Sequence, residues 1–191
     1  MKLYFATSNR HKYEEARRVL SEYGVELVQL TSVPKLEIQG ESLADIALNA
    51  ARTAYLRLGE PLIVEDAGLY IEALRGFPGP YSSYVYKTLG CRGILRLLEG
   101  EERRNAYFES AVAAIIPPYE EVFVARVHGA IAAEPRGEGG FGFDPIFIPR
   151  GEARTFAEMG VEEKNRLSHR ARALRMLGEW LRSRKIKRAQ L

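Results

Sequence analysis

The sequence contains a single cysteine, Cys91, among 191 residues. One thiol cannot form a disulfide within the chain or a cysteine-based metal site, and such a composition is typical of a reducing compartment. Apolar runs approaching the roughly 20 residues of a membrane span are also missing, and the first segment, M-K-L-Y-F-A-T-S-N, lacks the apolar core of a signal peptide. We therefore predict a cytoplasmic protein with no membrane partner.

A strong excess of one charge is absent as well. The 28 Lys and Arg residues outnumber the 25 Asp and Glu residues by only 3, with a pI near 9.0. Much of this basic bias lies in the C-terminal helix and tail, so nucleic-acid binding is a weak inference and we expect no stable nucleic-acid partner. No repeat, linker or low-complexity segment interrupts the sequence. A chain of this length suits one domain, residues 1–191, able to bury about 70% of its unfolded surface.

The order of the predicted elements indicates an α/β fold with a mixed sheet. Strands are expected at residues 2–7 and 25–30, on either side of a helix that Ser8 or Asn9 caps and Gly24 ends. A second helix is expected from about Ser42 to Leu58. Downstream we predict a strand ending at residue 66, helices at 81–89 and 92–98, an antiparallel hairpin at 107–116 and 122–133, a capping box at 155–158 and a last helix to about residue 184.

Two carboxylates stand where a short apolar strand ends. Glu65 and Asp66 follow Leu62–Val64, and neighbouring side chains in a strand point to opposite faces, so at most one of the two can face a given cleft. Gly68 then permits a turn or a close approach of a ligand. Mg²⁺ binds through one or two carboxylates and leaves its other positions to water and substrate phosphate. Asp66 is therefore a candidate metal ligand, although a solvated strand end explains the pattern equally well.

The junction between the first strand and the first helix has the composition of a phosphate-binding site. The helix start offers free N–H groups and a positive dipole end, and Lys12 adds a charge one turn further on. An ordinary capped helix with a solvated lysine is the alternative, because the paired glycines of a Walker loop are missing. The candidate residues are Thr7, Ser8, Asn9, Arg10, His11 and Lys12.

A glycine-rich segment, G-E-G-G-F-G-F-D-P-I-F-I-P, spans residues 137–149. Its glycines remove side chains where a flat ligand could approach, Phe141 and Phe143 offer aromatic faces, and Asp144 offers an acceptor. Stacking on an aromatic ring stabilises a bound base by about 1–3 kcal/mol. The segment predicts a nucleobase clamp at Phe141, Gly142, Phe143 and Asp144, with a hairpin loop around buried phenylalanines as the alternative.

The last helix carries four polar residues that do not share one face at 100° per residue: Lys164, Ser168, His169 and Arg170. If all of them contact a ligand, the chain must enter the helix near Ser168 and present them from its first turn.

Five motifs in order resemble the inosine triphosphate pyrophosphatase (Ham1) family. They are T-S-N-R-H-K (7–12), E-D-A-G-L (65–69), F-P-G-P-Y-S (77–82), G-G-F-G-F-D-P-I-F (139–147) and K-N-R-L-S-H-R (164–170). The resemblance implies Mg²⁺-dependent hydrolysis of the purine nucleoside triphosphates ITP, dITP and XTP to the monophosphate and pyrophosphate. It also implies a homodimer, and an elongated α/β sheet flanked by helices with two lobes around a central nucleotide-binding cleft.

The resemblance further implies a role for each matching residue. Asp66 matches the general base and metal-binding aspartate, and Glu37 the second metal-linked carboxylate. Residues 7–12 match the triphosphate site, Phe141 to Asp144 the base clamp, and Lys164 a phosphate or sugar contact. His169 and Arg170 match the readers of the purine edge, where their donors would satisfy a 6-oxo group and oppose a 6-amino group. Rejection of GTP, which also has a 6-oxo group, does not follow.

The sequence departs from the family pattern at three positions. Ala67, beside the aspartate in the substrate site, stands where many members have Ser or Thr, Phe143 where Tyr is common, and Leu48 where Glu is frequent. The first two changes remove a hydroxyl and the third a carboxylate near the metal.

Two other classes of function remain open from the sequence: a Maf-like pyrophosphatase for other nucleotides, and a non-enzymatic nucleic-acid-binding module.

Overall fold

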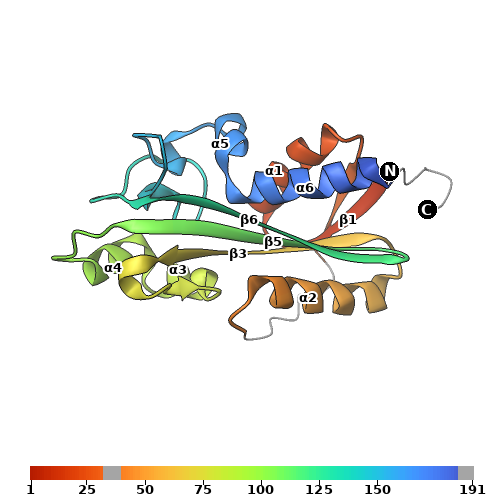
Figure 1. The fold of residues 1–191 in the computed structure, drawn as a ribbon, viewed down its shortest axis with the longest axis horizontal. Helices are drawn as coiled ribbons and strands as arrows, with labels where there is room; N and C mark the ends of the chain where they lie inside the picture. Colours follow the sequence, from red (N-terminus) through yellow and green to blue (C-terminus); the bar gives the residue numbers. More distant parts are fainter. Residues whose placement is uncertain (32–39, 185–191) are drawn as a thin grey trace. The chain divides into compact units, whose positions relative to one another are not determined.

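The structure is a computed structural model that describes residues 1–31 and 40–184. These residues form a seven-stranded sheet in the order β2-β1-β3-β5-β6-β7, with β4 paired to β3 (Figure 1). The strands are β1 (Lys2–Ala6), β2 (Glu26–Leu30), β3 (Leu62–Ile71), β4 (Pro78–Gly79), β5 (Asn105–Ile116), β6 (Tyr119–Ile131) and β7 (Phe147–Pro149).

The sheet is mixed, as the sequence predicts. β1 runs parallel to both β2 and β3, whereas β4 is antiparallel to β3 and β7 is antiparallel to β6. β5 and β6 are neighbours joined only through Pro117 and Pro118, and a two-residue connection can join only antiparallel strands. The predicted α/β class with a hairpin in its second half is therefore confirmed.

The chain divides into two compact units, and β3, β5 and β6 each contribute to both. The first unit comprises the described residues of Met1–Asp66, Ser110–Ala125 and Arg170–Leu191, and the second comprises Ala67–Glu109 and Arg126–His169.

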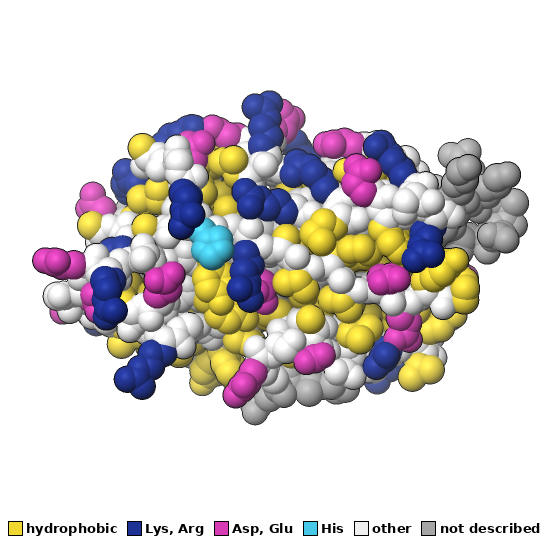
Figure 2. All heavy atoms as spheres, in the orientation of Figure 1, with side chains coloured by type: hydrophobic (Ala, Val, Ile, Leu, Met, Phe, Trp, Pro, Cys, Tyr) yellow, Lys and Arg dark blue, Asp and Glu magenta, His cyan; other side chains and the backbone are white. Residues whose placement is uncertain are grey.

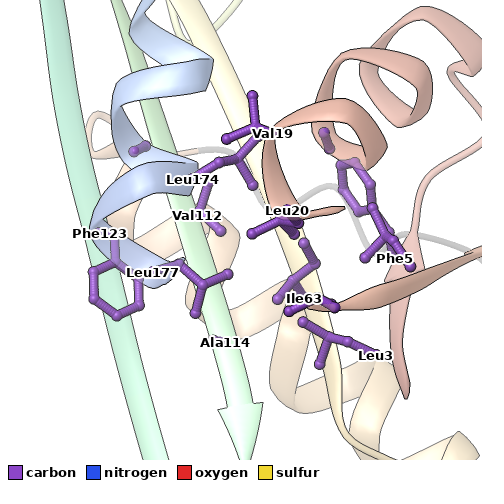
Figure 3. Close-up of a cluster of buried hydrophobic side chains, with 14 of the residues drawn as sticks. Leu3, Phe5, Val19, Leu20, Ile63, Val112, Ala114, Phe123, Leu174 and Leu177 are labelled. Carbon is purple, nitrogen blue, oxygen red and sulfur yellow. The ribbon is translucent and has the colours of Figure 1, made fainter. Parts of the chain in front are cut away.

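In the first unit, α1 (Arg10–Ser21) and α6 (His169–Ser183) cover one face of the sheet and α2 (Leu43–Leu58) covers the other (Figure 1). The first residue of α6, His169, belongs to the second unit. Figure 3 shows Val19 and Leu20 of α1 and Leu174 and Leu177 of α6 directed at the strands. All four are at most 1% exposed. This continuous apolar layer fixes α1 and α6 against the sheet.

Local signals set the ends of the first two helices. Asn9 caps α1, with its side chain accepting a hydrogen bond from the Lys12 N–H at 3.1 Å. Ser42 caps α2 in the same way, and Gly59 ends that helix in the left-handed region at φ +72°. These caps match the predicted ones, because each satisfies backbone groups that a helix end leaves without partners.

In the second unit, α3 (Ser82–Thr88) and α4 (Gly90–Leu97) lie on one side of its strands and α5 (Val161–Leu167) on the other (Figure 1). Its core contains three neighbouring aromatic rings, Phe108, Phe147 and Phe156. The predicted capping box is present: Thr155 N–H donates to Glu158 Oε2 at 2.7 Å at the start of a 3₁₀ turn.

None of the described helices is long and apolar enough to cross a membrane.

Two predicted boundaries are wrong. β3 continues past Asp66 to Ile71, because Gly68 serves a close strand contact and not a turn: a Cβ there would lie 2.3 Å from the Gly79 carbonyl oxygen. The segment after Gly160 forms two helices and not one, since Ser168 is extended (φ −68°, ψ 152°) and ends α5. Leu167 accordingly belongs to α5, where it packs on the second unit's core.

Candidate active site

The strand-to-helix junction is ordered by its own side chains. Thr7 Oγ1 accepts a hydrogen bond from the Asn9 N–H at 3.1 Å, and Asn9 in turn caps α1. The side chains of Ser8, Arg10 and His11 are exposed, so the junction presents polar groups to its surroundings. These features suit an anion at the helix start.

Lys12 does not extend into solvent. Its Nζ lies 2.7 Å from Glu65 Oε2 and also donates to the Glu65 carbonyl oxygen at 3.4 Å. The Lys12 side chain is 16% exposed and that of Glu65 is fully buried. The ammonium therefore stands at the edge of the interior, held by one carboxylate and one carbonyl.

Glu65 is the centre of a buried charge cluster in the first unit. Its Oε1 accepts hydrogen bonds from Ser110 Oγ at 2.7 Å and from Arg170 Nε at 3.1 Å, and Arg170 Nη1 also pairs with Glu15. Two cations thus face two carboxylates, as burial of charge demands. Burial alone would raise the pKa of the Glu65 carboxyl, but the charges of Arg170 and Lys12 hold that pKa well below its ordinary 4.5.

Asp66 differs sharply from Glu65. It is half-buried, and as the next residue of β3 it points to the opposite face of the strand. The sequence predicted that only one of the two carboxylates could serve a site. Glu65 is committed to Lys12, Arg170 and Ser110, and the role of Asp66 as metal ligand and base stays a prediction.

The glycine-rich segment is organised around a second buried ion pair, which lies in the second unit. Lys164 Nζ is 2.6 Å from Asp144 Oδ2, and neither side chain is more than 5% exposed. The same oxygen accepts a hydrogen bond from the Phe141 N–H at 2.8 Å, and Lys164 Nζ lies 4.8 Å from the centre of the Phe141 ring. The structure thus brings three predicted residues together.

Gly140 is required by this arrangement. Its φ is +68°, and a Cβ on it would lie 2.2 Å from Asp144 Oδ2. Gly142 also has a positive φ of +62°, but nothing lies within 4 Å of its Cβ position. Of these two glycines, Gly140 is therefore the one needed for both backbone conformation and space.

Phe143 lies apart from Phe141. Its ring is 3% exposed and meets Tyr86 edge to face at 5.4 Å, within the second unit's core. Its burial indicates a packing role, as in the alternative reading of the segment, whereas half-buried Phe141 keeps an accessible face. Ala67, next to Asp66, is half-buried.

His169 is the first residue of α6 and is 3% exposed. Its imidazole stacks on the Phe108 ring, with centres 4.7 Å apart and planes 10° from parallel. Because Ser168 breaks the helix, His169 and Arg170 lie in the first turn of α6, as the polar spacing requires if both contact a ligand.

Glu37 lies outside the described residues. Within residues 1–31 and 40–184, no group of three or more His, Cys, Asp or Glu side chains is arranged to hold a metal ion. The described part of the chain therefore holds no such cluster, and Asp66 and Glu37 as metal ligands stay predictions.

Sequence reasoning missed three residues of these clusters: Glu15, Ser110 and Phe108. Glu15 carried a usable signal, since it falls on the buried face of α1 beside Ala16 and Val19, and a charge on such a face needs a partner. Ser110 and Phe108 carried none, because their partners are distant in sequence.

Lys and Arg side chains on the face drawn in Figure 2 are interspersed with Asp and Glu side chains. This face therefore carries charges of both signs.

The described residues form an α/β protein with a mixed sheet flanked by helices and a polar junction between its first strand and first helix. The family model described as the Ham1 family matches residues 3–180. The chain belongs to the Ham1 family.

Individual relatives agree over nearly the whole length. The dITP/XTP pyrophosphatase of Hyperthermus butylicus is 54% identical over 180 residues, covering 94% of each protein. That of Methanopyrus kandleri is 55% identical over 181 residues, covering 94% of this chain and 96% of its own. A solved HAM1 protein from Coxiella burnetii has a TM-score of 0.85 at 33% identity, covering 96% of this chain and 99% of that one.

A solved dITP/XTP pyrophosphatase from Mycobacterium abscessus has a TM-score of 0.71 at 42% identity, covering 93% of this chain and 98% of that one.

Proposed function

We propose that the protein is a nucleoside triphosphate pyrophosphatase that hydrolyses dITP and XTP, and also ITP, to the monophosphate and pyrophosphate. Removal of these non-standard purine nucleotides would keep them out of the nucleotide pool. The observation that carries the proposal is the 54–55% identity, over 94% of the chain, to proteins named dITP/XTP pyrophosphatase.

The phosphate-binding groups would come from the first unit. Thr7 to Lys12 supply hydroxyls, the positive dipole end of α1 and the ammonium of Lys12. In this proposal Glu65 limits the mobility of Lys12, so that little side-chain entropy remains to be lost when phosphate binds. The other predicted triphosphate-binding residues of this junction include Ser8, Arg10 and His11, which are exposed.

The described residues fit a Mg²⁺ ion that depends on its substrate. Asp66 is a half-buried carboxylate at the position that matches the family's metal-binding aspartate, and Mg²⁺ often binds through one or two carboxylates plus substrate phosphates. Asp66 would hold the ion, with Glu37 as the predicted second ligand. Bound Mg²⁺ would neutralise charge on the phosphate oxygens.

In the proposed reaction, Asp66 accepts a proton from a water molecule as the water oxygen attacks the α-phosphorus. A bond forms between that oxygen and phosphorus, the bond from phosphorus to the oxygen bridging to the β-phosphate breaks, and pyrophosphate leaves with the electron pair. Lys12 and the start of α1 hold the phosphates in position, which is most of what phosphoryl chemistry requires of a protein.

The base-binding groups would be Phe141, Asp144, His169 and Arg170, with Lys164 as a phosphate or sugar contact beside them. Phe141 would stack on the purine. Its backbone N–H donates to Asp144 Oδ2, and the same oxygen pairs with Lys164, so the backbone at Phe141 is held in place. Arg170 stays a predicted reader of the purine edge, and its pairs with Glu15 and Glu65 would hold its guanidinium in one orientation. Donors aimed at a 6-oxo group would face a 6-amino group donor to donor.

The homodimer, the cytoplasmic location and the single two-lobed domain remain predictions from the sequence and its family resemblance. A native mass measurement would test the dimer.

Product analysis tests the proposed reaction. The purified protein is incubated with dITP or XTP and Mg²⁺, and the products are resolved by ion-exchange chromatography. Monophosphate and pyrophosphate in equal amounts are expected. Diphosphate and inorganic phosphate would contradict attack at the α-phosphorus, and no turnover of either nucleotide would reject the function.

A further inference from the structure

We propose that Phe108 is a positioning residue for base selection, acting through His169. This inference rests on the proposed function, in which His169 reads the purine edge. The observation behind it is the nearly parallel stack of the Phe108 ring on the imidazole, with a centre-to-centre distance of 4.7 Å and an angle of 10°.

Phe108 is itself held rigidly. Its ring meets Phe147 at 4.8 Å and 64° and Phe156 at 6.2 Å and 30°, and Phe147 and Phe156 lie 5.3 Å apart. Phe147 and Phe156 are fully buried and Phe108 is 8% exposed. Close-packed interiors leave such rings little freedom to tilt, so the imidazole rests on a fixed surface.

The same aromatic cluster also lies beside Lys164, the predicted phosphate or sugar contact. Lys164 Nζ lies 5.6 Å from the centre of the Phe156 ring and 2.6 Å from Asp144 Oδ2. Phe108 therefore contacts His169, Phe156 lies near Lys164, and Phe147 packs between these two rings. Of the three rings, the one stacked on the imidazole is Phe108.

Orientation matters because discrimination between a 6-oxo and a 6-amino purine depends on direction. A hydrogen bond is strongest above about 150° and weakens steeply below about 120°. A ring held parallel to Phe108 keeps its nitrogens in one plane, whereas a ring free to rotate can accommodate either kind of partner. The stack is therefore expected to affect the selection of the base and to have little effect on the chemical step.

The test compares Phe108→Leu with Phe147→Leu. Both variants lose one ring from the same apolar cluster, so a loss of stability is expected in each, but only the first removes the ring stacked on His169. For Phe108→Leu we expect the ratio of kcat/KM for dITP to that for dATP to fall by about tenfold or more, which corresponds to about 1.4 kcal/mol. The change should come from KM, with kcat for dITP within about threefold of wild type. Phe147→Leu should keep the ratio within about threefold.

A spectroscopic arm reports the stack directly. The chain has three histidines, so the imidazole C–H signals are few, and His169→Asn assigns the relevant pair. The upfield shift that a stacked ring causes should disappear in Phe108→Leu and persist in Phe147→Leu. If Phe108→Leu does not fold, Phe108→Met, which fills an irregular gap without a flat face, takes its place in both arms.

An unchanged dITP preference in the Phe108 variant, with the His169 shift lost, would overturn the proposal. An equal loss of preference in Phe147→Leu would do so too, because it would show a general effect of packing. These outcomes differ from failure of the proposed function, in which the wild-type protein itself would not prefer dITP.

Discussion

Arg170 and Glu65 form an ion pair in the interior of the first unit, with Arg170 Nε 3.1 Å from Glu65 Oε1 and side chains that are 2% and 0% exposed. Glu15 and Lys12 complete the cluster with one further charge of each sign. Burial of these four ions is tolerable only because each faces an opposite charge. The cluster joins α1, β3 and α6, and it holds the lysine proposed to bind phosphate.

Replacement of Arg170 with Met should destabilise the fold. Glu65 and Glu15 would lose a buried cation, and breaking a buried pair from one side typically costs about 3–5 kcal/mol. Urea unfolding followed by circular dichroism measures this. The matched control is Arg52→Met, which removes an exposed pair with Glu120 and should cost about 0–1 kcal/mol. Equal losses in the two variants would show that the cluster is not a buried ionic unit.

Stability should depend on Glu65 in a particular pH range. Its pKa in the folded protein lies below the ordinary 4.5, so its contribution is fully present above the unfolded value and is lost as pH falls toward the folded value. The difference in unfolding free energy between wild type and Glu65→Gln should therefore be constant from about pH 6 to pH 7 and shrink steadily below about pH 4.5. A difference that does not change down to about pH 3 would contradict the low pKa.

Asp66→Asn should abolish most turnover without unfolding the protein. A positioned general base contributes about 10²–10⁴-fold, and the amide cannot accept the proton from water. We expect kcat for dITP to fall by at least about 100-fold, and the melting temperature to stay within a few degrees of the wild-type value. Glu60→Gln, an exposed carboxylate ahead of the same strand, is the control. Retention of more than about a tenth of kcat would remove Asp66 from the role of base.

Gly140→Ala should disrupt the base-binding segment, whereas Gly142→Ala should not. Both positions have positive φ, so both variants carry a backbone strain of about 1–2 kcal/mol. Only the Gly140 variant also forces a methyl group against Asp144 Oδ2, and with it the Lys164 pair. We expect KM for dITP to rise about tenfold more in Gly140→Ala than in Gly142→Ala. Similar values would show that the Asp144–Lys164 geometry does not govern substrate binding.

The sequence predicted most of the fold because its signals are local. Asn9 and Ser42 cap helices with their own side chains, Gly59 ends one, and alternation in the second half identified the β5–β6 hairpin. The errors at Gly68 and in the assignment of Leu167 have a common cause. The first depends on Gly79, which approaches β3 from another strand, and the second on the core into which α5 packs.

The candidate site was predicted less completely for the same reason. Motif order predicts roles for Lys12, Asp66, Asp144, Lys164 and His169, but not the residues that they contact. That Lys12 binds Glu65, or that His169 stacks on Phe108, depends on contacts between residues separated by more than 50 positions. Periodicity cannot report such contacts, whereas it did place Val19 and Leu20 in the core.

The most direct test of the proposed function is a comparison of kcat/KM for dITP, XTP, dATP and dGTP under one Mg²⁺ concentration, with pyrophosphate release as the readout. The proposed donors at the 6-oxo position predict that dITP and XTP exceed dATP by at least about 10²-fold, because a site that hydrogen-bonds a substrate group strongly rejects an analogue that cannot pair. Equal rates for dITP and dATP would contradict base selection by His169 and Arg170, and with it the account of this protein as an enzyme for non-standard purine nucleotides.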